Sequence, residues 1–145
     1  MSLAYAYPTS RFEPAVLVDL HSRAERERLS QSALKGFFKL AAAWQLRDED
    51  ARELLGGLSA SSFYDWKKNP DRLLEVDRIT RISYLLGIYK ALHILYGDKL
   101  ADEWVSLPNT NLIFGGRTPL ATMLAGGLLA MQTVRKLLDA RRGGL

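Results

Sequence analysis

The chain has 145 residues, of which 48% are apolar and 25% are charged, an ordinary composition for a globular protein with one sizeable core. It contains no cysteine, which excludes disulfides, thiolate nucleophiles and cysteine-ligated zinc and fits the cytoplasm, where we expect the protein to act. The net charge is +4, yet residues 45–97 carry eight basic and eight acidic residues, so nucleic-acid binding there would depend on how the charges are arranged.

No segment predicts a membrane span or a secretory signal. The longest apolar run, residues 84–96, is interrupted by Lys90 and His93 and is shorter than the roughly 20 residues that a spanning helix needs. A signal peptide has basic residues before its apolar segment, and residues 1–10 contain no basic residue. We therefore expect no membrane partner.

The first third of the chain predicts an arm followed by a helix. Pro8 and Pro14 interrupt any early helix, so residues 1–30 are expected to form a partly flexible N-terminal arm, although the alternating charges of residues 23–28 are typical of a solvated helical face. From Ser32 onward, apolar residues recur at spacings of three and four, as in a helix that buries one side. These residues are Leu34, Phe37, Phe38, Ala41, Ala42 and Trp44.

Residues 48–68 predict two short helices joined by a tight turn. Asp48 is expected to cap the first helix, with acidic residues in its first turn at the positive end of the helix dipole. A glycine pair ends that helix, because glycine adopts the left-handed conformation at little cost. Ser59 is expected to cap the second helix, which ends before Pro70 since the residue preceding a proline avoids helical angles.

The remainder of the chain predicts more helices around one loop. Apolar spacing predicts a long helix over residues 74–96, with a possible bend at Gly87. Asp98 begins a further helix, whose side chains Leu100, Trp104 and Leu107 are expected to face inward.

A proline-bounded loop over residues 108–120 precedes the last helices. Thr118 is expected to cap a helix with Pro119 at its first position, and Gly126-Gly127 should turn the chain before a final helix. No segment alternates apolar and polar residues with period two, so the predicted fold class is all-α.

Residues 48–68 fit a helix-turn-helix, in which the second helix lies in the major groove of DNA and the first braces it. Helical geometry places Ala60, Phe63 and Trp66 toward the core. Hydroxyl groups near the start of the second helix can approach base edges or phosphates, and lysines near its end can reach the DNA backbone. The candidate DNA-binding residues are Ser59, Ser61, Ser62, Tyr64, Lys67 and Lys68.

Helix pairs joined by glycine turns also occur in small helical proteins that bind no DNA. Residues 58–68, however, resemble the recognition helices of regulators of the Cro and Xre type. This resemblance favours a DNA-binding role for the second helix, while Asp65 places a carboxylate on a surface that would face phosphates.

No catalytic, cofactor or metal site stands out. The chain has two histidines, His21 and His93, and a histidine within an apolar helix pattern such as that around His93 is more often a packed residue than a catalyst. The glycine pairs form no nucleotide-binding motif, and Ser61 and Ser62 have no base near them in sequence. We therefore expect a protein that is not an enzyme and that needs no cofactor or metal.

The last third of the chain carries an ordered set of residues: Trp104, Pro108-Asn109, Phe114-Gly115-Gly116-Arg117-Thr118-Pro119-Leu120, Gly126-Gly127, and Val134-Arg135 through Leu138. In this combination it resembles the toxin-binding domain of the MbcA/ParS/Xre antitoxins, and the family's Xre-like helix-turn-helix would cover most of the middle. The resemblance implies a helical bundle with an Xre/Cro-like helix-turn-helix over residues 31–97, followed by a small helical toxin-binding domain over residues 98–145.

The resemblance implies the antitoxin of a type II toxin–antitoxin system, paired with a RES-domain toxin that destroys NAD. In this family the C-terminal domain covers the entrance of the toxin's active site, and the helix-turn-helix represses its own operon by binding promoter DNA as an oligomer. The expected partners are therefore the cognate RES-domain toxin, promoter DNA and a second copy of the chain in a homodimer. ParS-type members instead restrain a related toxin that modifies proteins using NAD, and the sequence leaves this alternative open.

Two segments form the candidate toxin-binding surface. In the loop, Leu112 and Ile113 are expected to be core residues, whereas the glycine pair and its neighbours shape the contact. In the basic tail, arginine could engage carboxylates that line a dinucleotide cleft, although basic residues at a helix end also complement its dipole. The candidate toxin-binding residues are Asn109, Phe114, Gly115, Gly116, Arg117, Arg135, Arg141, Arg142 and Leu145.

Two other functions stay open from the sequence. One is a helix-turn-helix transcription regulator whose C-terminal half is a dimerisation or ligand-sensing module, with no toxin partner. The other is an all-α enzyme with a site that the sequence does not reveal. A toxin encoded by the adjacent reading frame that co-purifies with this protein would favour the antitoxin.

Overall fold

The computed structural model describes residues 18–143, and within this range the chain forms helices and turns without strands. The predicted all-α class is therefore confirmed, and none of these helices is long and apolar enough to cross a membrane. Residues 1–17 of the predicted arm, and Leu145, lie outside the described residues. The elements are α1 (Arg23–Ala43), α2 (Asp48–Leu54), α3 (Ala60–Lys68), α4 (Val76–Leu95), α5 (Asp98–Glu103), the 3₁₀ turns η2 (Trp104–Ser106) and η3 (Leu112–Phe114), and α6 (Pro119–Arg142).

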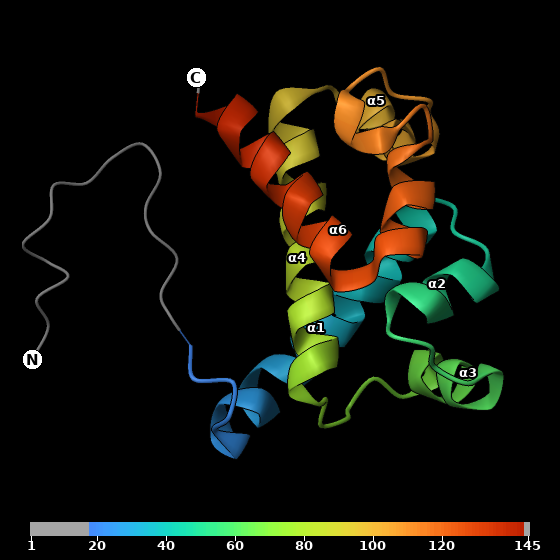
Figure 1. Cartoon of the computed structure of the whole chain (residues 1–145). Helices are drawn as coiled ribbons and strands as arrows, with labels where there is room; N and C mark the ends of the chain where they lie inside the picture. The colour runs from blue at the N-terminus through green and yellow to red at the C-terminus, as the bar shows by residue number, and fades with distance from the viewer. Residues whose placement is uncertain (1–17, 144–145) are drawn as a thin grey trace, which may run out of the picture.

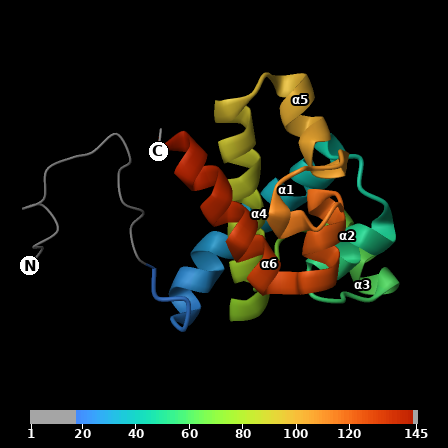
Figure 2. The ribbon, with the colours of Figure 1, turned by 45° about the horizontal axis from the view of Figure 1, so that its top comes forward.

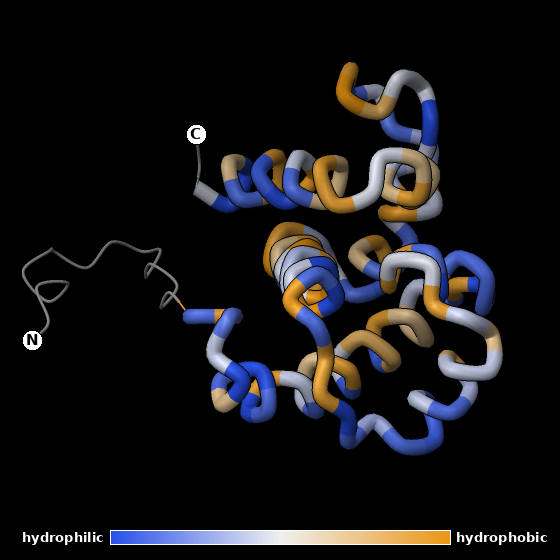
Figure 3. The backbone as a smooth tube through the Cα atoms, turned by 60° about the horizontal axis from the view of Figure 1, so that its bottom comes forward, coloured by the Kyte–Doolittle hydropathy of each residue, from blue (hydrophilic) through white to orange (hydrophobic). Residues whose placement is uncertain are grey.

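Helix α4 is the centre of the fold. Helices α1 and α6 pack along it and α5 contacts it near its end (Figure 1). Figure 3, which looks nearly along α4, shows other helices on several sides of this helix. Its buried side chains recur every three or four residues, as the sequence pattern predicts: Ile79, Ile82, Leu85, Ile88, Ala91 and Leu92.

The helix-turn-helix forms as predicted, with two local differences. Ser59 caps α3 by accepting a hydrogen bond from the backbone N–H of Ser62. Arg47, not Asp48, occupies the cap position of α2, so Asp48 is already helical and acts only through its charge in the first turn. Ala60 is exposed rather than buried, because it is the first residue of α3 and lies at the N-terminal end of the helix.

The buried side of α3 packs on α1. The ring of Phe63 is 5% exposed and lies 5.4 Å, centroid to centroid, from that of Phe38 on α1. Trp66 is half-buried, with the guanidinium carbon of Arg78 on α4 at 5.5 Å from its ring centroid. These contacts fix the position of α3 relative to the central helix.

Helix α6 crosses α4 (Figures 1 and 2). At their close contact, Gly87 of α4 lies against Arg135 of α6. A Cβ atom at Gly87 would lie 1.7 Å from Nη1 of Arg135 on α6, so the glycine leaves room for this guanidinium. Gly87 does not interrupt α4. The predicted turn at the second glycine pair is confirmed, because Gly127 has φ 61° and ψ −141°, which is not helical. The element α6 therefore consists of two helical segments that meet at a kink at Gly127.

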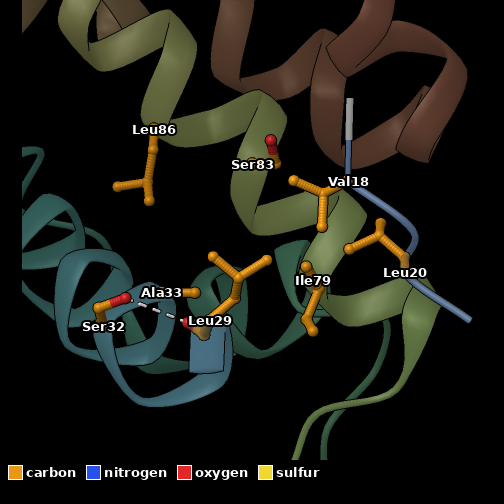
Figure 4. Close-up of a pocket in the computed structure, with 8 residues that line it drawn as sticks. All are labelled: Val18, Leu20, Leu29, Ser32, Ala33, Ile79, Ser83 and Leu86. Atoms are coloured by element: carbon orange, nitrogen blue, oxygen red, sulfur yellow. Dashed lines mark hydrogen bonds between the residues drawn. The ribbon is translucent and has the colours of Figure 1, made fainter. Parts of the chain in front are cut away.

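An apolar groove lies between α1 and α4, beside the first described residues. Its lining comes from both helices and from the chain that leads into α1, as Figure 4 shows. This groove is an apolar surface that the described residues of the monomer leave open. The residues lining it are Val18, Leu20, Leu29, Ser32, Ala33, Ile79, Ser83 and Leu86.

A buried serine joins α1 to the start of α4. Ser30 is 1% exposed, and its hydroxyl accepts a hydrogen bond of 2.9 Å from the backbone N–H of Leu74 and donates one to the carbonyl of Arg26. Leu74 precedes α4, so this bond holds the connection between α3 and α4 against α1.

We predict that Ser30→Ala lowers the free energy of unfolding by about 1–3 kcal/mol, because it leaves the buried N–H of Leu74 without an acceptor. Denaturant-induced unfolding measures the change. Ser32→Ala is the matched control, since Ser32 is exposed on the same helix. Equal stabilities of the two variants would contradict the role assigned to Ser30.

Candidate functional site

Helix α3 presents most of the predicted DNA-binding residues to solvent. Ser59, Ser61, Lys67 and Lys68 are exposed, and Tyr64 is 63% exposed. The ammonium group of Lys68 lies 4.6 Å from the centroid of the Tyr64 ring. The exposed face thus carries hydroxyls at the start of the helix and cations near its end. Ser62 is half-buried and donates its backbone N–H to the Ser59 hydroxyl at 3.2 Å.

Two groups of carboxylates lie close to these lysines. Asp65 on α3 forms an ion pair with Arg72, which offsets the negative charge that the sequence places on this face. Asp48 and Glu49, at the start of α2, line a shared hollow with Lys67, Lys68 and Tyr64. Positive and negative charges are therefore mixed around α3, in agreement with the equal numbers of basic and acidic residues in residues 45–97.

The loop between η2 and α6 is shaped by its own side chains. The amide oxygen of Asn109 accepts a 2.9 Å hydrogen bond from the backbone N–H of Asn111, whose own amide oxygen accepts one of 3.0 Å from Ile113. Gly115 and Gly116 then take φ values of 56° and 82°, a region in which residues with a Cβ are strained. The asparagine side chains and the two glycines thus determine the backbone conformation of the loop.

The apolar triplet in this loop is divided by the 3₁₀ turn η3. Phe114 is 2% exposed and packs edge-on against Trp104, at 5.9 Å between ring centroids. Leu112 is 95% exposed and Ile113 is 42% exposed, so the prediction that both are core residues is wrong. One tight turn directs its successive side chains to different sides, and Phe114 takes the inward position. Phe114 therefore anchors the loop and does not present its ring to a partner.

Two further predictions of burial are wrong, and a change of helical period explains one of them. Leu100 and Leu107 were expected to face inward with Trp104, but they are 43% and 41% exposed. Helix α5 ends at Glu103 and the chain continues into η2, so the α-helical spacing no longer applies at Leu107. Trp104 itself is buried, as predicted.

The three arginines predicted at the end of the chain occupy different environments. Arg135 lies at the crossing with α4, where its Nε donates to Asp139 at 3.0 Å, so this guanidinium is largely committed within the monomer. Arg142 is half-buried, with Nη1 at 3.7 Å from Asp139. Arg141 is exposed and donates from Nη1 to the hydroxyl of Tyr96 at 3.3 Å.

The structure brings the loop and the end of α6 together. Asn109 and Arg141 line one hollow, along with Tyr96, Trp104, Leu107, Pro108 and Thr110. Asn109 also lines a neighbouring hollow with Gly115, Gly116 and Leu112. Arg117 is exposed just beyond the glycine pair. Five of the predicted toxin-binding residues thus lie on or beside one surface, whereas Arg135 and Phe114 are structural.

His93 forms an ionic cluster that the sequence reasoning missed. Its Nδ1 lies 3.1 Å from a carboxylate oxygen of Asp98, and its Nε2 lies 2.8 Å from one of Asp102. Burial lowers the pKa of His93, but hydrogen bonds and charge from Asp102 and Asp98 outweigh burial, and the pKa is raised above 6.5. The two aspartates stand four apart on α5, so their spacing is the signal that could have revealed a shared partner.

The cluster predicts a pH dependence of stability. The folded state holds the His93 proton more tightly than the unfolded state, so the stabilisation is complete below pH 6.5 and is lost as pH rises through the folded pKa. Denaturant unfolding from pH 5.5 to 8.5 should show this loss in the natural protein and a smaller loss in His93→Gln. Asp102→Asn should also flatten the profile, and identical profiles for all three proteins would contradict the prediction.

Each of the two candidate surfaces lies in a region of the chain that matches a known domain family. Residues 21–87, which include α3, match the antitoxin Xre-like helix-turn-helix domain. Residues 91–144, which include the loop and the end of α6, match the antitoxin Xre/MbcA/ParS C-terminal toxin-binding domain. The chain is also 41% identical over 112 residues to the uncharacterized protein y4oB of Sinorhizobium fredii (strain NBRC 101917 / NGR234), a match that covers 77% of this chain and 84% of that protein.

Proposed function

The chain belongs to the Xre/MbcA/ParS antitoxin family, and from this premise we propose that it neutralises an NAD-consuming RES-domain toxin by covering the entrance of the toxin's active site. It is an antitoxin of a toxin–antitoxin system, with a helix-turn-helix and a toxin-binding domain. The observation that carries the proposal is the hollow shared by Asn109 and Arg141, which joins the loop to the end of α6 inside the toxin-binding region.

The shared hollow suits inhibition by occlusion. The guanidinium of Arg141 is exposed and makes one neutral hydrogen bond of 3.3 Å, to Tyr96, so it can exchange this bond for a carboxylate in the toxin. A planar guanidinium binds such a group at two points, which fixes orientation as well as affinity. Inhibition of this kind is stoichiometric and needs no catalytic residue or cofactor on the antitoxin.

We predict that the purified chain stops NAD loss caused by the toxin of the adjacent reading frame at a fixed molar ratio. Arg141→Ala should weaken inhibition about tenfold, because it removes a charged group from the shared hollow. Deletion of residues 141–145 should weaken it at least as much, while circular dichroism shows that the helical fold is kept.

Arg23→Ala is the matched control, since Arg23 is an exposed arginine on α1 that pairs with Glu27. Unaltered inhibition by both tail variants would remove the tail from the proposal. A toxin that is neutralised but modifies a protein, rather than depleting NAD, would replace the RES-type assignment with the ParS type. Failure to bind any adjacent gene product would favour a transcription regulator without a toxin partner.

We further propose that the protein represses its own operon through α3, as a homodimer within the toxin–antitoxin complex in the cytoplasm. The exposed hydroxyls of Ser59 and Ser61 and the exposed lysines support contacts with DNA. Two copies match the two half-sites that dimeric helix-turn-helix proteins read one helical turn apart. The groove between α1 and α4 is the surface that we assign to the second copy.

The lysines at the end of α3 yield a test by salt titration. Lys67→Ala with Lys68→Ala should weaken promoter binding, and the slope of log K against log salt should fall by about 0.9 for each phosphate that the variant no longer neutralises. Lys90→Ala with Lys99→Ala is the control of equal charge, since both residues are exposed outside the helix-turn-helix match. An unaltered slope would exclude Lys67 and Lys68 from the phosphate contacts.

A further inference from the structure

We propose that Leu112 is an apolar anchor of the toxin interface, inserting into an apolar recess of the toxin beside the group that Arg141 contacts. This inference rests on the proposed function and adds a specificity-determining contact to it. Its basis is the position of one side chain, which is 95% exposed at the tip of an otherwise ordered loop.

Exposed leucines are common on protein surfaces and usually need no explanation. Leu112 differs because another residue of the same 3₁₀ turn, η3, already fills the buried position beneath the loop. Phe114, two residues later, is buried against Trp104, and it occupies the core position beneath the loop. Leu112 therefore faces outward as a result of how the loop is anchored, and its burial requires another molecule.

The backbone that carries Leu112 is preorganised. The side chain of Asn111 caps η3 by accepting the N–H of Ile113, and Asn109 accepts the N–H of Asn111. After the turn, Gly115 donates its N–H to the carbonyl of Leu112 at 3.2 Å. A side chain on such a frame loses little conformational freedom on binding, which is the condition under which one contact contributes strongly to affinity.

The surroundings of Leu112 continue the surface proposed for the toxin. Pro108, Gly115 and Gly116 line the hollow next to Leu112, and Pro108 and Asn109 also line the hollow that holds Arg141. Ile113, 42% exposed, and Leu107, 41% exposed, add apolar area from the same stretch of chain. A few residues that become fully desolvated in well-packed pockets contribute most of the binding energy of an interface, and arginine is enriched among them. Burial of Leu112 in such a pocket would add to the contact made by Arg141.

The test compares Leu112→Ser with two control variants in the full-length chain. Leu112→Met keeps an apolar side chain at the tip, and Leu73→Ser removes a leucine that is 39% exposed within the helix-turn-helix match. The probe is the toxin encoded by the adjacent reading frame, with binding measured by calorimetry. Melting temperature and solution mass are measured for each free variant.

We expect Leu112→Ser to raise the dissociation constant at least about 20-fold. Leu112→Met and Leu73→Ser should stay within about threefold of the natural chain. The melting temperatures of the two Leu112 variants should agree with that of the natural chain, because the Leu112 side chain makes little contact within the monomer.

Binding of Leu112→Ser within about threefold of the natural chain would overturn the inference while leaving the proposed function intact. A lower solution mass of free Leu112→Ser would also overturn it, since Leu112 would then contact a second copy of the chain. Failure of the natural chain to bind the toxin would refute both proposals together.

Discussion

The close crossing of α6 over α4 at Gly87 is the contact on which the geometry of the candidate toxin-binding surface depends. The glycine provides space for the guanidinium of Arg135, so the two helices meet without a side chain of α4 between them at this point. From this crossing, α6 extends in one direction to the loop that precedes it and in the other to Arg141 beside Tyr96. Any shift of the crossing would move the loop and the helix end relative to one another, and the hollow that they share would change shape.

Helix α4 also positions the helix-turn-helix. Its first turn follows Leu74, which is held by Ser30 of α1, and Arg78 contacts the ring of Trp66 on α3. The described residues share one hydrophobic core, in which Leu54 of α2 and Met123 of α6 belong to the same cluster. The regions that match the two families are thus parts of one packed body across residues 18–143.

Local signals in the sequence predicted much of this fold. Ser59 and Thr118 cap their helices as expected, because a cap depends on a side chain and an N–H group three residues away. The predictions failed where burial depends on tertiary partners. The sequence placed Leu112 and Ile113 in the core and Phe114 at the contact surface, yet it is Phe114 that packs on Trp104. Arg135 became structural because Gly87 lies opposite it. Periodicity cannot predict such pairings, since they join residues distant in sequence.

The separation of the candidate surfaces has a consequence for regulation. Figure 1 shows α3 and the loop between α5 and α6 well apart, at the bottom and the top of the view. A toxin covering the loop would therefore leave α3 of the same chain accessible to DNA. Coupling between toxin binding and promoter affinity would then require a difference in the arrangement of whole chains, because a ligand changes an equilibrium only through differential binding to two states. The geometry between copies, set at a surface such as the groove between α1 and α4, is where such coupling would arise.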